Sequence, residues 1–75
     1  MRKREKQIVS MLLHQNGVLF DQVLEKFEIS RRTLYYDIKK INESLFEIGS
    51  IIKQGEQLYL EGNHKLISFT LQEES

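Results

Sequence analysis

The sequence predicts a mainly α-helical domain that carries a small β-hairpin. Three observations point to this fold class. Apolar residues recur at helical spacing in successive segments between residues 3 and 48. Two short apolar runs then bracket a turn that contains Gly55, as in a β-hairpin. The length of 75 residues limits the chain to one small domain with a compact core.

Composition narrows the class of protein. Hydrophobic residues make up 40% of the chain, which indicates a globular protein. Cysteine is absent, so a disulfide scaffold and a thiolate metal site are excluded, and a reducing cytoplasm is favoured. No apolar run approaches the ~18 residues of a membrane helix, and no secretory signal pattern is present. We therefore expect a cytoplasmic protein without a membrane partner.

The net charge of zero conceals an uneven distribution. Residues 1–40 contain nine Lys and Arg against five Asp and Glu, whereas residues 41–75 contain two against six. Because a local positive field attracts phosphate, the first half is suited to nucleic acid. Chance segregation of solvated charge is the alternative.

The first helix is predicted over residues 3–15. Its apolar stripe consists of Ile8, Val9, Leu12 and Leu13, and the Asn-Gly pair at 16–17 ends it. Three apolar residues at 18–20 then predict a short strand or a buried segment.

A second, shorter helix is predicted over residues 22–27, with Asp21 as its N-cap. Only two residues separate it from Ser30, the N-cap of the next helix. Two helices joined by so tight a turn form a helix-turn-helix. Glu28 lies in that turn, where a positive φ would carry a modest cost.

The third helix is predicted over residues 31–48 and is expected to stop at Gly49. Leu34, Ile38, Ile41 and Leu45 recur on one face, which indicates a helix packed against a core. Strands are then predicted at 51–54 and 57–61. This order predicts a winged helix-turn-helix, with a three-helix core and a two- or three-stranded wing.

The last segment is ambiguous. Ile67, Phe69 and Leu71 alternate as in a strand, yet Leu66, Ile67 and Leu71 also fit a helix. We expect residues 1–62 to form the domain, and residues 63–75 to form a linker helix that leads toward downstream domains.

The outer face of the 31–48 helix is the candidate binding site. Arg32, Tyr36 and Lys39 face away from the apolar stripe, and we expect them to contact base edges in the major groove of double-stranded DNA. Asp37 is expected to pair with a nearby cation instead. The candidates for contact with the DNA backbone are Ser30, Arg31, Thr33, Tyr35, Lys40, Lys53 and Gln54. The alternative is an ordinary charged helix face.

An enzyme is not expected. The two histidines, His14 and His64, lie in different elements without metal-ligand spacing, and the glycines form no phosphate-binding loop. Neither a cofactor nor a small-molecule ligand is predicted. The competing function is a winged-helix protein-interaction module without nucleic acid, whose docking patch would be Tyr35, Tyr36 and Phe46.

Residues 30–42, SRRTLYYDIKKIN in one-letter code, resemble the S-x-R-T-[ILV]-x-x-D-I signature that opens the recognition helix of bacterial winged-helix regulators. The likeness is to the N-terminal domain of sugar-operon activators with phosphotransferase-system regulation domains, such as mannitol operon activators and proteins labelled BglG-type antiterminators. Residues 58–62, LYLEG, resemble the G-Y-x-L-x-G end of the wing in that group and in deoxyribonucleoside-repressor-like domains. Here Gln57-Leu58 stand in place of Gly-Tyr.

The resemblance covers residues 4–62. It implies a DNA-binding transcription factor that is a homodimer through regulation domains after residue 75. In that family these domains are phosphorylated on histidines, and neither His14 nor His64 matches such a site.

Overall fold

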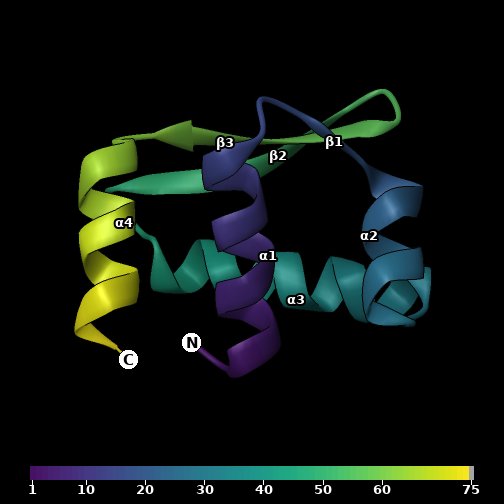
Figure 1. Cartoon of the computed structure of the whole chain (residues 1–75), viewed down its shortest axis with the longest axis horizontal. Helices are drawn as coiled ribbons and strands as arrows, with labels where there is room; N and C mark the ends of the chain where they lie inside the picture. Colours follow the sequence, from purple (N-terminus) through teal and green to yellow (C-terminus); the bar gives the residue numbers. More distant parts are fainter. Residues whose placement is uncertain (75) are drawn as a thin grey trace.

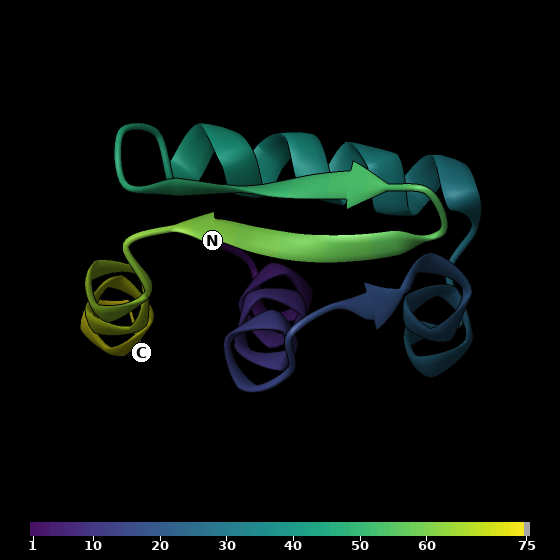
Figure 2. The same ribbon diagram turned by 90° about the horizontal axis from the view of Figure 1, so that it is seen from above.

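The computed structural model describes residues 1–74. In chain order its elements are α1 (Lys3–His14), β1 (Val18–Leu19), α2 (Phe20–Phe27), α3 (Arg31–Ser44), β2 (Gly49–Gln54), β3 (Gln57–Gly62) and α4 (His64–Glu73) (Figure 1). The helices α4, α1 and α2 lie in a row, and α3 runs across behind them. Seen from above, the β2–β3 hairpin lies between that row and α3 (Figure 2).

The sheet has three antiparallel strands in the order β1-β3-β2. The hairpin pairs Ile51 with Leu60 and Gln54 with Gln57 across its turn. The two-residue strand β1 adds to the other edge of β3, where Val18 pairs with Leu58. Each hairpin strand is slightly longer than predicted, and the addition of β1 makes the wing three-stranded.

One hydrophobic core joins all these elements. Apolar stripes form because residues three and four apart share a helix face, while alternate residues share a strand face. The buried residues are Ile8, Val9, Leu12, Val18, Phe20, Val23, Leu34, Ile41, Leu45, Ile51, Leu58, Leu60 and Ile67. This arrangement of three helices and a wing is a winged helix-turn-helix, as predicted.

The turn between α2 and α3 has the expected strain. Glu28 is the C-cap of α2 and has a φ of 53°, in the left-handed region. Its backbone N–H donates to the carbonyl of Glu25, and the N–H of Ile29 donates to Leu24. The turn is thus held by backbone hydrogen bonds that offset the cost of a side chain at positive φ.

The predicted start of α2 was wrong. The helix begins at Phe20 rather than Gln22, and its N-cap is Leu19 rather than Asp21. The reason lies in the sheet: β1 ends at Leu19, and the N–H of Phe20 donates to the carbonyl of Glu56 at 2.8 Å. The strand therefore leads directly into the helix, where the N–H of Leu19 donates to the side-chain oxygen of Gln22 at 3.2 Å. The end of α1 differs from the prediction by one residue. The helix ends at His14, and Gln15 is its C-cap in an extended conformation.

The predicted end of α3 at residue 48 was also wrong. The helix ends at Ser44, and residues 45–48 form a turn in which Glu47 has a φ of 75°. Gly49 does not stop the helix but opens β2. A Cβ there would lie 2.6 Å from both the carbonyl oxygen of Glu61 and Cδ1 of Ile67, so packing of the sheet and α4 requires glycine.

The polar residue Asn42 joins α3 to the wing. Its side-chain amide donates to the carbonyl of Ile51 at 3.1 Å, and its side-chain oxygen accepts from the N–H of Ile51 at 2.7 Å. The helix α3 and the wing are thus connected by a pair of hydrogen bonds as well as by apolar contact.

The segment after the wing is the helix α4, not a strand. Asn63 caps it, with a side-chain oxygen that accepts from the N–H of Leu66 at 3.1 Å. The helix packs beside α1: Ile67 is buried in the common core, and the Lys6 ammonium donates to the carbonyl of Glu74 at 2.7 Å. Ile67 therefore belongs to the same core as residues 1–62.

Candidate nucleic-acid interface

The start of α3 is defined by a side-chain cap. The Ser30 hydroxyl accepts from the backbone N–H of Thr33 at 3.1 Å and donates to the Thr33 hydroxyl at 3.0 Å. This satisfies an N–H group that the first helical turn leaves without an intrahelical partner. The cap sets the direction in which the following side chains leave the helix.

Arg32, Tyr36 and Lys39 are exposed on one face of α3, at spacings of four and three residues. Among the described residues 1–74, none of the three makes a hydrogen bond or an ion pair. The opposite face buries Leu34 and Ile41, with Ile38 packed at its edge. The helix thus presents two cations and a phenol that are free to bind a ligand.

A buried aromatic ring gathers three of the backbone-contact candidates. The Phe20 ring, at the start of α2, lies 4.7 Å from the Arg31 guanidinium and 5.0 Å from the Tyr35 ring. The Lys53 ammonium of β2 lies 5.6 Å from the same ring. Attraction between a cation and an aromatic face favours this arrangement. The ring therefore holds side chains from α3 and the wing next to each other.

No local pattern in the sequence indicates this role of Phe20. Three apolar residues at 18–20 predicted only a strand or a buried segment, and the contacts of the ring come from elements 11 to 33 positions later in the chain. A cation–aromatic contact at such a separation depends on the tertiary fold.

The candidates for contact with the DNA backbone differ in whether their polar groups are already paired within the domain. Arg31 also pairs with Asp21 at 3.4 Å, and Lys40 lies 3.8 Å from Glu43 in the next turn of α3. Lys53 donates to the carbonyl of Gly55 at 2.7 Å, which holds its ammonium near the hairpin turn. Thr33 is half-buried, whereas Gln54 is exposed beside the turn.

A partly buried ion pair fixes α3 against α1. The Arg4 guanidinium donates two hydrogen bonds to the Asp37 carboxylate, from Nε at 2.6 Å and from a terminal nitrogen at 3.0 Å. The pairing of Asp37 predicted from the sequence is therefore present. The hydrogen bond to Asp37 raises the pKa of the Arg4 guanidinium above its ordinary value, so Arg4 stays charged. It also brings the basic N-terminal end of α1 next to α3.

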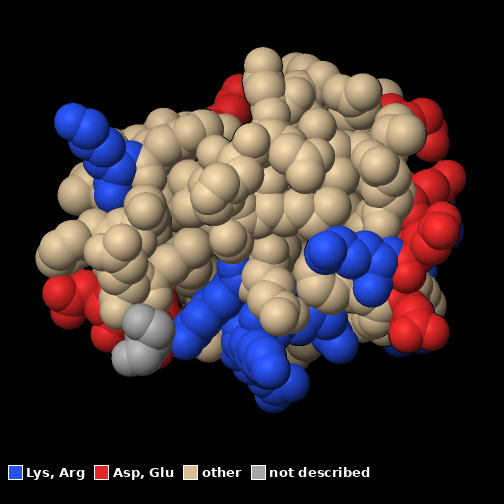
Figure 3. Space-filling model, viewed as in Figure 1, with Lys and Arg blue, Asp and Glu red and all other residues tan. Residues whose placement is uncertain are grey.

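Charge is unevenly distributed over the surface. In Figure 3 most of the visible Lys and Arg side chains gather around the N-terminal end of α1 and between α1 and α2. Acidic side chains lie over α2 and near the C-terminal end of α4. On this face of the molecule, the basic region thus lies around the start of α1, beside the acidic surface of α2.

The exposed aromatic residues do not form one patch. Tyr35 and Tyr36 lie in the first half of α3, whereas Phe46 lies beyond its end in the 45–48 turn. Ten residues of helix span about 15 Å. The two tyrosines are instead flanked by Arg31, Arg32 and Lys39 along the helix, which suits a polyanion better than an apolar partner.

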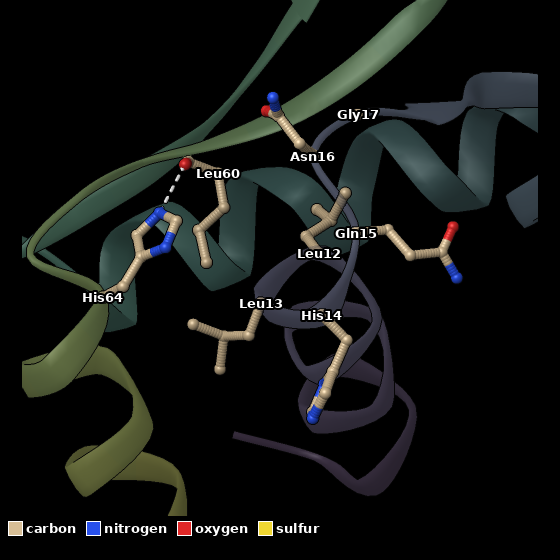
Figure 4. A pocket seen from close by; sticks show the side chains of 8 residues that line it. All are labelled: Leu12, Leu13, His14, Gln15, Asn16, Gly17, Leu60 and His64. Carbon is tan, nitrogen blue, oxygen red and sulfur yellow. Dashed lines mark hydrogen bonds between the residues drawn. The ribbon is translucent and has the colours of Figure 1, made fainter.

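A hollow of about 300 Å³ lies between the end of α1 and the start of α4 (Figure 4). His14 and His64 both line this hollow, a proximity that their sequence positions did not predict. Each ring donates within its own region, His14 to the carbonyl of Ser10 at 2.7 Å and His64 to that of Leu60 at 2.8 Å. In Figure 4 the two rings do not point at each other. This geometry offers no acid–base pair.

Residues 1–74 contain no group of three His, Cys, Asp or Glu side chains able to hold a metal ion. Within the same residues no helix is both long and apolar enough to cross a membrane.

Comparison with known proteins adds one match. A family model described as an HTH domain matches residues 4–57, from the first turn of α1 to the start of β3. Neither the curated proteins nor the solved structures contain a significant match to the chain. The matched segment includes both helices of the helix-turn-helix and the first wing strand.

Proposed function

Because this chain belongs to the helix-turn-helix (HTH) domain family, we propose that it is the sequence-specific DNA-binding domain of a transcriptional regulator. The recognition helix α3 enters the major groove of double-stranded DNA, and the wing contacts the adjacent backbone. The observation that carries this proposal is the free stripe of Arg32, Tyr36 and Lys39 beside cations that are held by Phe20.

Base contacts and backbone contacts divide between two sets of residues. Arg32 and Lys39 bind guanine O6 and N7, and the Tyr36 hydroxyl contacts a neighbouring base or phosphate. The Phe20-supported side chains of Arg31, Tyr35 and Lys53 bind phosphates, as do Ser30, Thr33, Lys40 and Gln54. Since phosphate contacts fix register without reading sequence, the two sets have different mutational signatures.

Arg32→Ala tests the base-reading role. The preferred site is first selected from random duplex DNA, and affinity is then measured by fluorescence anisotropy at fixed salt. The substitution weakens binding to that site by about 1–3 kcal/mol and relaxes preference at one base pair. The control is Lys26→Ala, which removes a cation from a hollow beside α1. Uniform weakening on all sequences, without relaxed preference, would show that Arg32 contacts only the backbone.

Salt dependence tests the nucleic-acid function as a whole. Neutralisation of phosphates releases counterions, so the logarithm of the binding constant falls by roughly 0.9 per contacted phosphate for each tenfold rise in salt. Lys53→Ala reduces this slope by about one and leaves base preference unchanged. A binding constant that is independent of salt would refute the proposal in favour of a protein-interaction module.

We further propose that the parent regulator controls a bacterial sugar operon and binds an inverted repeat as a homodimer through regulation domains beyond residue 75. The support is the likeness of residues 30–42 to the recognition-helix signature of such regulators. Expression profiling of a deletion strain tests this role. Changes confined to operons unrelated to sugar uptake would contradict it.

A further inference from the structure

The outer face of α4 exposes large apolar side chains that do not pack against the rest of the domain. Ile67 is buried and Leu71 packs at the edge of the core, so this side of the helix faces α1. On the other side, Leu66 is 48% exposed and Phe69 is 58% exposed. Large apolar side chains gathered on one surface mark interaction sites.

A third apolar side chain lies at the same end of the molecule. Phe46, in the turn after α3, is 76% exposed. The N–H of Asn63, the N-cap of α4, donates to the carbonyl of Ile48 at 2.9 Å, which joins that turn to the start of α4. Figure 1 shows the C-terminal end of α3 and the helix α4 together at one end of the longest axis. We call Phe46, Leu66 and Phe69 the end patch.

The charges on α4 are arranged symmetrically about Phe69. Lys65 and Glu73 lie four residues before and after it, so the three side chains form one ridge of the helix. Neither Lys65 nor Glu73 makes an ion pair or hydrogen bond within residues 1–74. A cation and an anion are thus left unpaired on either side of an exposed aromatic ring.

We propose that α4 is a self-association surface on which a second copy of this chain docks with its α4 antiparallel. A two-fold axis through the Phe69 contact sets Phe69 against Phe69 and Lys65 of each copy against Glu73 of the other. Such an interface is isologous, so each charge pair occurs twice. A parallel arrangement would oppose lysine to lysine and glutamate to glutamate, which electrostatic repulsion disfavours.

The interface is small, and the dimer is correspondingly weak. A helix of ten residues is about 15 Å long, which offers less area than the ~800 Å² per partner of a standard interface. We expect a dissociation constant of about 10–1,000 µM, because the buried core consists of a few aromatic and aliphatic side chains.

Dimerisation through α4 leaves the candidate DNA interface open. The N-terminal end of α3, with the hairpin turn beside it, lies at the end of the molecule away from α4 (Figure 2). The longest extent of the molecule is 28 Å. In the pair the N-terminal ends of the two α3 helices therefore lie away from the contact between the copies.

Charge reversal of the 75-residue chain tests the proposal in the absence of DNA. Sedimentation equilibrium at protein concentrations up to about 1 mM measures the dimer dissociation constant. Lys65→Glu or Glu73→Lys alone turns both cross-dimer pairs into repulsions, and each raises the constant by about tenfold. An equimolar mixture of the two variants restores both attractions and returns dimerisation to the original level, as a heterodimer. The double variant K65E/E73K does the same as a homodimer.

These reversals do not act by unfolding α4, because Glu at the first turn and Lys at the last turn both favour the helix dipole. Phe69→Ala weakens the dimer without altering charge, and Glu25→Lys on α2 is the control that leaves association unchanged. A monomer at all concentrations overturns the proposal. Equal failure of single variants, mixture and double variant would likewise exclude antiparallel pairing. Because no DNA is present, neither result depends on the proposed DNA-binding function.

Discussion

The Arg4–Asp37 ion pair makes an asymmetric contribution to stability. Asp37 is 2% exposed, and both oxygens of its carboxylate are bonded to Arg4, whose side chain is 41% exposed. Arg4→Met leaves a buried carboxylate without donors, a defect that costs about 3–5 kcal/mol. Because water can reach the half-open space left by the guanidinium, we expect a loss of stability at the lower end of this range, about 3 kcal/mol. Asp37→Ala leaves a cation that solvent can hydrate, and should cost about 1–2 kcal/mol.

Urea denaturation followed by circular dichroism measures these losses. A 75-residue domain has a free energy of unfolding of about 4–11 kcal/mol, so Arg4→Met should remove a large part of it. The midpoint of thermal unfolding should fall by about 12–24 °C for that variant. The double variant Arg4→Met/Asp37→Leu replaces the pair by apolar groups and should recover most of the stability.

Two results would refute this reasoning. Equal losses for Arg4→Met and Asp37→Ala would mean that burial of the carboxylate does not determine the cost. A double variant no more stable than Arg4→Met would mean that the damage comes from lost packing between α1 and α3, not from an unpaired charge.

Three further substitutions are checked by the same denaturation measurement. Ser30→Ala removes the N-cap of α3 and should cost about 1 kcal/mol, whereas Ser44→Ala at the other end should cost little; equal losses would contradict the capping role. Asn42→Ala leaves the N–H and carbonyl of Ile51 without protein partners and should cost about 1–2 kcal/mol; an unchanged midpoint would show that water replaces the amide. Glu28→Gly relieves the positive φ and should stabilise by about 0.5 kcal/mol, and a net loss would argue against strain in the turn.

Local patterns predicted much of the fold because they act over a few residues. The Ser30 cap, the stripe of Leu34, Ile38 and Ile41, and the Gly-containing hairpin turn all depend on neighbours within one or two turns. The pairing of Asp37 with a cation was also predicted, since a carboxylate beside a core stripe requires a partner.

Features set by distant parts of the chain were missed. Gly49 was interpreted as a helix stop, but glycine is needed there because Glu61 and Ile67 occupy the space of a Cβ. Nothing near Phe20 indicates that its ring supports Arg31 and Lys53, and nothing near residue 45 indicates that α3 stops before Gly49. Such positions are determined by contacts that form only after the elements have come together.

The two hydrogen bonds between Asn42 and Ile51 have a further consequence for how the chain behaves in concentrated solution. The strand β2 is an edge of the sheet, and an edge strand is a template to which a strand of another molecule can add. The Asn42 carboxamide offers Ile51 one acceptor and one donor, in the way that a residue of a neighbouring strand would. The Asn42 side chain of α3 thus occupies the centre of this edge, where it blocks the pairing of a strand from another molecule.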